Sequence, residues 1–253
     1  MKKNFIILWL ASFVIVFVTV YISNILDKDY PITSTFGIEG KKVSYRFKKV
    51  HYGKEDYKVI IRTDIDELTG KLLWKSDTDI NWRSKELEKS KLILSGTIPV
   101  LKPENKIDYY LELNYKDKKY VLPTNKKVSL TFFGKIPVVV NVLEYLLLYL
   151  GLILAVRTGL EFFNNGLKSK KFGFFTLALF LTLIALINPL YLTYKYGFIN
   201  SSIPPISRLF LLSDILIFIL WIATLVTIFR SEKFKFLPLI SAVITLIIFV
   251  LFK

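Results

Sequence analysis

The chain contains no cysteine and a single histidine, His51, among its 253 residues. Disulfides are therefore excluded. So are thiolate metal sites, iron–sulfur clusters, a haem held by two histidines, and zinc sites built from histidine and cysteine. The sequence also lacks a glycine-rich phosphate loop, an HExxH motif, a nucleophile elbow and a C-terminal prenylation signal. We expect no cofactor, and no catalytic motif points to a reaction.

Acidic residues are scarce relative to basic ones, with 20 Asp and Glu against 35 Lys and Arg, which gives a net charge of +15. The excess is spread out, because residues 26–135 hold 23 basic and 16 acidic side chains and the rest of the chain holds 12 and 4. Without a dense basic stripe, the sequence does not predict a nucleic-acid partner. It favours attraction to membrane lipids with anionic headgroups or to an acidic polymer of the cell envelope.

Long apolar runs dominate what is present, since 53% of the residues are hydrophobic. They gather into five runs, at residues 5–22, 137–156, 174–192, 209–229 and 237–252. At about 1.5 Å per residue, a run of about 20 residues crosses a hydrocarbon core about 30 Å thick, and the fifth run is the shortest. The sequence therefore predicts an α+β membrane protein with a bundle of five transmembrane helices. The expected parts are an N-terminal transmembrane anchor at 1–26, an extracytoplasmic domain at 27–135 and a four-helix transmembrane region at 136–253.

The first apolar run has features of both a signal peptide and an anchor. Lys2 and Lys3 form a positive start, but the run is longer than a usual signal core, and Tyr21 stands where a cleavage site needs a small residue. We therefore expect an uncleaved anchor. The richness in Lys, Ile, Asn and Phe is typical of an AT-rich bacterial genome.

Lys and Arg near the ends of the spans predict the orientation, because they are enriched on the cytoplasmic side. With the N-terminus inside, nine lie on inner segments and three on short outer segments. The inner nine are Lys2, Lys3, Arg157, Lys168, Lys170, Lys171, Arg230, Lys233 and Lys235; the outer three are Lys195, Arg208 and Lys253. We expect a multi-pass protein of the bacterial cytoplasmic membrane, with the N-terminus in the cytoplasm and both residues 27–135 and the C-terminus outside.

Residues 28–135 alternate between apolar and polar side chains, as strands with one buried face do. Six apolar sets carry this period of two: Val43, Tyr45 and Phe47; Tyr57, Val59 and Ile61; Leu72 and Trp74; Leu92 and Leu94; Ile107, Tyr109, Leu111 and Leu113; and Val128, Leu130 and Phe132. Residues 107–123 predict a hairpin with a short charged loop. Turn signals between the runs indicate about seven or eight strands in an antiparallel β-sandwich.

In this strand pattern the domain resembles immunoglobulin-like and fibronectin type III-like sandwiches. The resemblance implies binding of a protein or a glycan through loops or edge strands rather than catalysis. Trp74 and Trp82 are the aromatic candidates for a ligand platform, although tryptophan at such positions more often packs in the core or at its rim.

Ionisable residues inside spans are costly and therefore candidates for function. Glu144 and Asp214 each lie a few residues inside the predicted outer end of a helix, and Asn141 shares a helical face with Glu144. The candidate intramembrane polar cluster consists of Asn141, Glu144, Asn188, Asp214, Lys195 and Arg208. Such a cluster holds helices together through hydrogen bonds, forms a pocket for an ion, a lipid headgroup or a substrate, or couples the helical bundle to the outer domain. Arg157 and Glu161 form a separate i,i+4 pair, expected at a helix end and worth a few tenths of a kcal/mol.

Three functions agree with these features. The first is a non-catalytic binding or accessory subunit of the envelope, whose sandwich engages a protein or glycan partner. The second is a transport or channel subunit that uses Glu144 and Asp214. The third is a membrane-embedded enzyme that acts on lipid or glycan, with the same two carboxylates lining an outward cavity.

Overall fold

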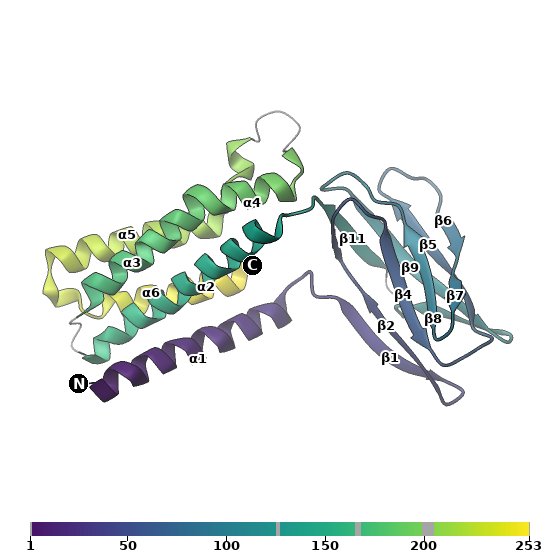
Figure 1. Cartoon of the computed structure of the whole chain (residues 1–253), viewed down its shortest axis with the longest axis horizontal. Helices are drawn as coiled ribbons and strands as arrows, with labels where there is room; N and C mark the ends of the chain where they lie inside the picture. The colour runs from purple at the N-terminus through teal and green to yellow at the C-terminus, as the bar shows by residue number, and fades with distance from the viewer. Residues whose placement is uncertain (1, 125–126, 165–167, 199–204, 253) are drawn as a thin grey trace. The chain divides into compact units, whose positions relative to one another are not determined.

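The computed structural model describes residues 2–124, 127–164, 168–198 and 205–252. It combines apolar helices with two β-sheets (Figure 1), which confirms the expected mixed class at the coarse level. The chain forms two compact units. The helical unit contains Met1–Asp27, Ile136–Tyr194 and Phe198–Lys253, and the β unit contains Lys28–Lys135 with Lys195–Gly197.

The β unit has more strands than the seven or eight expected. Its described part contains β1 (Ile32–Ile38), β2 (Lys41–Phe47), β3 (Val50–Tyr52), β4 (Tyr57–Thr63), β5 (Thr69–Ser76), β6 (Arg83–Glu86), β7 (Glu88–Ser90), β8 (Ile93–Ile98), β9 (Lys106–Tyr115), β10 (Lys118–Leu122) and β11 (Val128–Phe133). The expected strands did not include β1, β3, β6 or β7. Strands β3, β6 and β7 have only three or four residues, which are too few to show an alternating pattern, and β1 contains few large apolar side chains.

The strands form a five-stranded sheet in the order β1-β2-β4-β8-β7 and a six-stranded sheet in the order β3-β11-β9-β5-β6, with β10 paired to β9. The expected hairpin is confirmed, because β10 pairs antiparallel with β9 from Lys118 opposite Tyr115. The expectation of a wholly antiparallel fold was wrong at one pair. Strand β3 runs parallel to β11, with His51 opposite Phe132, so the second sheet is mixed.

Both sheets bury one face against the same apolar cluster. The alternation explains which face, because inward positions such as Val43, Phe47, Tyr109 and Leu111 are fully buried. One inward assignment was wrong. Leu92 is 57% exposed, because it precedes β8 and therefore lies outside the alternating strand.

The helical unit contains α1 (Lys2–Leu26), α2 (Val138–Leu160), α3 (Ser169–Thr182), α4 (Asn188–Lys195), α5 (Leu212–Arg230) and α6 (Leu237–Phe252). A 3-10 turn at Glu161–Asn164 continues α2, and a π-helix at Leu183–Ile187 joins α3 to α4 without a break. Two further 3-10 turns lie at Ile206–Arg208 and Glu232–Phe234. The second helix therefore extends well past residue 156, where the apolar run ends.

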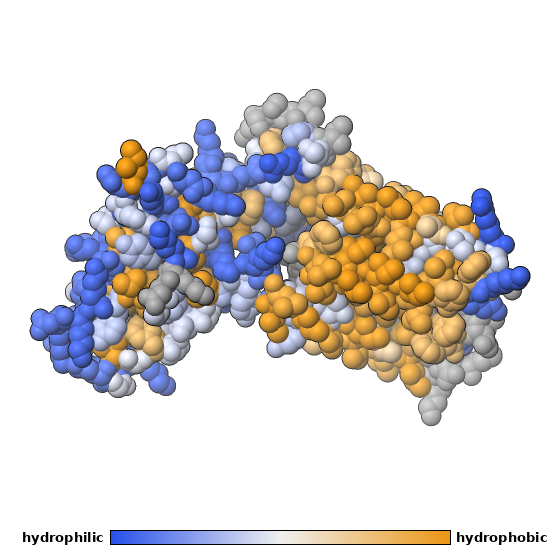
Figure 2. Space-filling model, turned by 180° about the vertical axis from the view of Figure 1, so that it is seen from behind, coloured by the Kyte–Doolittle hydropathy of each residue, from blue (hydrophilic) through white to orange (hydrophobic). Residues whose placement is uncertain are grey.

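Four helical segments in the described residues are long and apolar enough to cross a membrane: Phe5–Leu26, Val138–Asn164, Ser169–Lys195 and Leu212–Arg230. The fifth apolar helix, α6, has only 16 residues. Large apolar side chains cover the visible surface of the helical unit, while hydrophilic side chains cover most of the β unit (Figure 2). This distribution is compatible with a membrane protein.

Small and hydroxyl side chains allow the helices to pack closely. Gly159 leaves no room for a side chain, because a Cβ there would come within 2.9 Å of the Ala242 side chain on α6. Two buried hydrogen bonds join α5 to α6: Trp221 Nε1 donates to Thr245 Oγ1 at 3.0 Å, and the hydroxyls of Thr224 and Ser241 are 2.6 Å apart. Small residues and interhelical hydroxyl bonds are the usual means by which apolar helices associate.

Candidate functional sites

The helical unit contains a cavity of about 90 Å³ that is lined by polar side chains from three helices. Glu144 comes from α2, Asn188 from α4, and Ser213 and Asp214 from α5, while apolar side chains of α2, α5, α6 and the π-helix complete the walls. The cavity is large enough for a few water molecules, since one water occupies about 30 Å³ of liquid.

The π-helix explains why Asn188 is positioned there. Pro189 has no N–H and its ring clashes with the carbonyl four residues earlier in a regular helix, so the turn before it widens. The backbone N–H of Asn188 then bonds to the carbonyl of Leu183, five residues back. The buried Asn188 amide donates a short hydrogen bond to the Asp214 carboxylate, which also accepts one from the Ser213 hydroxyl at 3.4 Å. The bond between Asn188 and Asp214 connects α4 to α5.

The six residues of the candidate polar cluster are only partly brought together. Glu144, Asn188 and Asp214 line one cavity, whereas Asn141, Lys195 and Arg208 are not among its lining residues. Asn141 is half-buried on α2, and Arg208 is exposed in a 3-10 turn. Lys195 is the last residue of α4 but groups with the β unit, where its ammonium lies 4.7 Å from the centre of the Phe133 ring.

Arg157 and Glu161 form a buried ion pair, which corrects the expectation of a weak pair at a helix end. Both side chains are 0% exposed, and Arg157 Nη2 lies 2.5 Å from Glu161 Oε1. The rings of Phe5, Trp9 and Phe172 surround the guanidinium, with their centres 5.4, 5.6 and 4.9 Å from Cζ. Cation–π attraction partly replaces the lost water, and the pair holds α1, α2 and α3 together.

Glu161 has a second partner, because its Oε2 accepts a hydrogen bond from Asn164 Nδ2 at 3.1 Å. Among the residues that the structure describes, Arg157 Nε and Nη1 meet no hydrogen-bond acceptor. A buried charge with incomplete hydrogen bonding depends strongly on its ion-pair partner. The arrangement is closed to solvent, so it acts as a structural link between helices and offers no space for a substrate.

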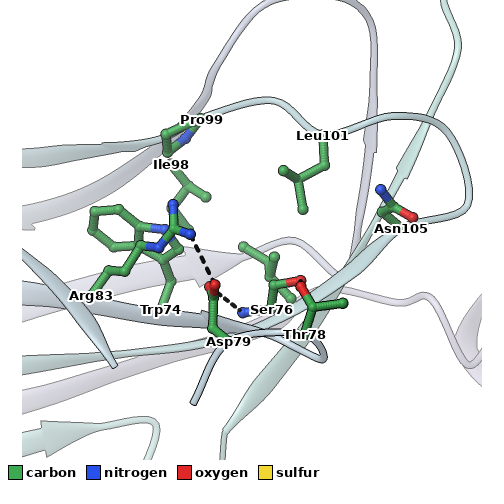
Figure 3. Close-up of a pocket in the computed structure, with 10 residues that line it drawn as sticks. Trp74, Ser76, Thr78, Asp79, Arg83, Ile98, Pro99, Leu101 and Asn105 are labelled. Carbon is green, nitrogen blue, oxygen red and sulfur yellow. Dashed lines mark hydrogen bonds and ion pairs between the residues drawn. The ribbon is translucent and has the colours of Figure 1, made fainter. Parts of the chain in front are cut away.

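The β unit contains a second, larger cavity of about 170 Å³ that sequence reasoning did not find. Figure 3 shows its residues around a common space, with the Leu101 side chain directed toward it. One part of the wall is apolar, formed by Trp74, Ile98, Pro99, Leu101 and Ile107; the other is polar, formed by Ser76, Thr78, Asp79, Arg83 and Asn105. Ligand pockets for drug-sized molecules measure about 300–1,000 Å³, so this one accommodates a single small group.

A turn after β5 fixes the polar side of this cavity. Asp79 accepts a hydrogen bond from Arg83 Nη2 at 2.9 Å and another from the backbone N–H of Ser76 at 3.2 Å (Figure 3). The hydrogen bond from the Ser76 backbone, and to a smaller extent the one from Arg83, hold the pKa of the Asp79 carboxyl below its usual range. Asp79 is therefore ionised at neutral pH with both oxygens engaged, which suits a fixed recognition group better than a proton donor or acceptor.

The remaining aromatic candidate has a different role. The Trp82 ring lies 4.9 Å from the Tyr110 ring in an edge-to-face contact, and Lys127 Nζ lies 4.9 Å from the Trp82 ring centre. Trp82 is not among the residues that line the Figure 3 cavity, whereas Trp74 is. Trp82 therefore packs against a residue of strand β9, whereas Trp74 lines the cavity.

The features that were missed had little local signal. Gly151 and Gly159 indicate close contacts of α2 with its neighbours, but Arg157 is two residues from Gly159 and lies on a different helical face, so the glycines do not predict its burial. The polar residues 76–79 between two strands indicate a turn. Nothing local indicates that this turn meets Ile98 and Leu101 around a cavity.

No protein-family model matches this chain, and no curated protein matches it in sequence.

Proposed function

We propose that the chain is an integral membrane protein of the bacterial cell envelope that acts as a non-catalytic binding or accessory subunit. Its β unit, as a sandwich outside the cytoplasm, engages a partner. The Figure 3 cavity carries this proposal, because it combines an apolar wall with a polar rim in a space that fits one small group.

A glycan is the partner that this cavity favours. A sugar ring has an apolar face and a rim of hydroxyls, and the cavity offers the Trp74 indole beside the Asp79 carboxylate, the Arg83 guanidinium and the Asn105 amide. The Asp79 oxygens are already held by Arg83 and Ser76, so the polar groups are pre-positioned before a ligand arrives.

The helices support the membrane placement. Four of them have the required length and composition, and their large apolar side chains face outward. Removing the buried Arg157 from the charge count leaves eight inner cations against three outer ones, so the charge asymmetry still favours a cytoplasmic N-terminus.

We include α6 as the fifth span. Its 16 residues extend about 24 Å, which is shorter than the hydrocarbon core and requires local thinning of the bilayer. The buried bonds from Trp221 and Thr224 to α6 support its place within the bundle. The C-terminus is then outside.

Labelling of a single cysteine tests the topology without background, because the chain has none of its own. Lys118→Cys, at the start of β10, should react with an impermeant maleimide in intact cells. Reaction only after lysis would place the β unit in the cytoplasm and overturn the envelope function.

Partner binding is tested with Trp74→Ala and Arg83→Ala in the full-length protein, with Trp82→Ala as the matched control. Envelope glycan fragments should bind the wild type and the control, and binding should fall strongly in both cavity variants. If the wild type captured a protein and bound no glycan, the ligand of the cavity would be a side chain of that protein partner and not a sugar. Equal binding by all variants would remove the cavity from the proposal.

A further inference from the structure

The outer face of the five-stranded sheet carries a row of basic side chains. Inward positions of β2 and β4 form the core, and the charged residues on the outward positions are Lys42 and Arg46 on β2 and Lys58 and Arg62 on β4. All four are exposed. We call Lys42, Arg62, Arg46 and Lys58 the cation row; the outward residues between them, Ser44 and Ile60, are uncharged.

The strand register spaces these cations evenly. Ser44 lies opposite Arg62, so Arg62 falls midway between Lys42 and Arg46 along the strand direction. Lys58 is four residues before Arg62 on the antiparallel strand, which places it two positions beyond Arg46. Each step is two residues, or about 6.7 Å, and adjacent strands are about 4.8 Å apart. The row is therefore about 20 Å long and only one strand spacing wide.

The four side chains of the cation row make no ion pair and no hydrogen bond within the described part of the chain. The carboxylates nearest to them in sequence are Glu39, which pairs with Lys116 at 2.7 Å, and Asp56 and Asp64 at the two ends of β4. Asp56 at one end accepts a hydrogen bond from the backbone N–H of Val100 at 3.0 Å. Asp64 at the other end is exposed and follows Thr63, which pairs with Val43, so it lies next to Lys42 in the register; it forms no ion pair with these cations within the same residues.

The other sheet shows that this is not a general property of the unit. On its outward face, Lys71 pairs with Glu86 at 3.4 Å and Lys119 with Glu112 at 2.9 Å. Like charges placed side by side on a sheet are destabilising. On the outward face of the six-stranded sheet these lysines have carboxylate partners, whereas the cation row on the five-stranded sheet has none within 4 Å in the described residues. Uncompensated cations in a row are the electrostatic footprint expected of a surface that meets an anion.

We propose that the cation row binds a linear polyanion, a polymer chain that carries phosphate or carboxylate groups along its length, outside the cytoplasm. This inference rests on the proposed placement of the β unit and adds the chemistry of a partner. A chain fits better than an anionic membrane surface, because the cations follow one narrow line and do not spread over a plane. Arginine side chains form bidentate contacts with phosphate or carboxylate, and lysine adds point charges.

The Lys58 end of the row and the Figure 3 cavity lie at the same end of β8. Lys58 is opposite Thr97 on the outward face, and the next residue, Ile98, is buried on the inward face and lines the cavity. The two surfaces have different chemistry, so variants can separate them.

The test uses the full-length protein in nanodiscs of neutral lipid, with a fluorescent poly(glycerol phosphate) as the probe and dextran as the neutral polymer. The wild type should bind the polyanion with strong salt dependence and should not bind dextran. Arg46→Gln/Arg62→Gln should weaken binding several-fold and reduce the slope of log K against log[salt] by about 1.4, because each neutralised phosphate on a single chain contributes about 0.7. The matched control, Lys71→Gln/Lys119→Gln, removes the same net charge from the paired face and should leave both quantities unchanged.

A second measurement does not depend on variants. Bound polyanion should protect Lys42 and Lys58 from acetylation in the wild type and leave Lys71 and Lys119 reactive. Equal losses in the two double variants, uniform protection of all four lysines, or tighter binding to anionic vesicles than to the polymer would each overturn the proposal. Trp74→Ala alters the cavity and leaves the cation row intact, so this variant should still bind the polyanion. Absence of glycan binding in the wild type with polyanion binding retained would therefore reject the cavity function and leave the cation row standing.

Discussion

The two units of this protein place their charged and apolar side chains in opposite ways. In the β unit, apolar residues such as Phe47 and Tyr109 are buried and the charged side chains are at the surface. In the helical unit, large apolar side chains such as Phe17 are exposed, while Arg157 and Glu161 are fully buried. A unit with a polar exterior gains stability by removing apolar surface from water, whereas a bundle with an apolar exterior gains little from that and uses close packing and polar contacts between helices.

The largest expected effect comes from breaking the buried ion pair. Arg157→Ala should lower the free energy of unfolding by about 3–5 kcal/mol, because Glu161 would remain buried without its cation. The matched control is Lys71→Ala, which breaks an exposed pair with Glu86 and should change stability by at most about 1 kcal/mol. Denaturation in detergent, followed by intrinsic fluorescence, measures both.

The double variant Arg157→Met/Glu161→Met sharpens this test. Apolar side chains of similar length remove both charges together, so much of the stability lost in Arg157→Ala should return. Similar small effects for Arg157→Ala and Lys71→Ala would show that water or lipid headgroups reach the pair and would contradict its burial.

Two phenylalanines, one buried in the β unit and one exposed on the helical unit, test whether the two units place their apolar side chains in opposite ways. Phe47 is 0% exposed in the β unit, so Phe47→Ala should cost about 3–5 kcal/mol through reduced burial and a cavity. Phe17 on α1 is 74% exposed, so Phe17→Ala should stay within about 0.5 kcal/mol. Thermal melting of both variants in detergent is the measurement. A large loss for Phe17→Ala would mean that this face of α1 packs against another protein.

The contact between α4 and α5 should have an intermediate effect. Asp214→Leu removes the acceptor of the Asn188 amide and should lower stability by about 1–2 kcal/mol, whereas Asp214→Asn keeps hydrogen bonding and should be mild. Melting temperatures of the two variants decide between them. If Asp214→Asn folds normally and still abolishes a measured flux, the residue serves transport and not only packing.

The smallest expected effect is a pH dependence of the β unit. The hydrogen bonds from Ser76 and Arg83 lower the pKa of Asp79, and a hydrogen bond from Lys116 lowers the pKa of Glu39. Both groups therefore stabilise the folded state above the unfolded pKa of about 4, and this stability is lost as the pH falls through the folded pKa. Urea unfolding from pH 7 to pH 3 should show the decline, and Asp79→Asn should flatten it. A slope unchanged by Asp79→Asn would assign the acid sensitivity elsewhere.

Local patterns made much of the architecture predictable. Alternation correctly assigned Val43, Val59 and Leu111 to the core, since a period of two depends only on neighbouring residues. The hairpin of β9 and β10 followed from two such runs around a charged turn. Leu92 was misassigned because no local signal marks where β8 begins. The parallel pairing of β3 with β11 was missed because it joins segments about 80 residues apart along the chain.

The sequence by itself determined the class of structure: apolar helices together with strands that bury one face. This information is local, since length, composition and periodicity are properties of contiguous residues. Only the tertiary structure decided which polar groups meet. Arg157 is enclosed by Phe5, Trp9 and Phe172 from distant parts of the chain, and Arg62 lies between Lys42 and Arg46 because of a strand register. The physical reason is that charge interactions depend on separations in space and on burial, and both are set when distant segments pack.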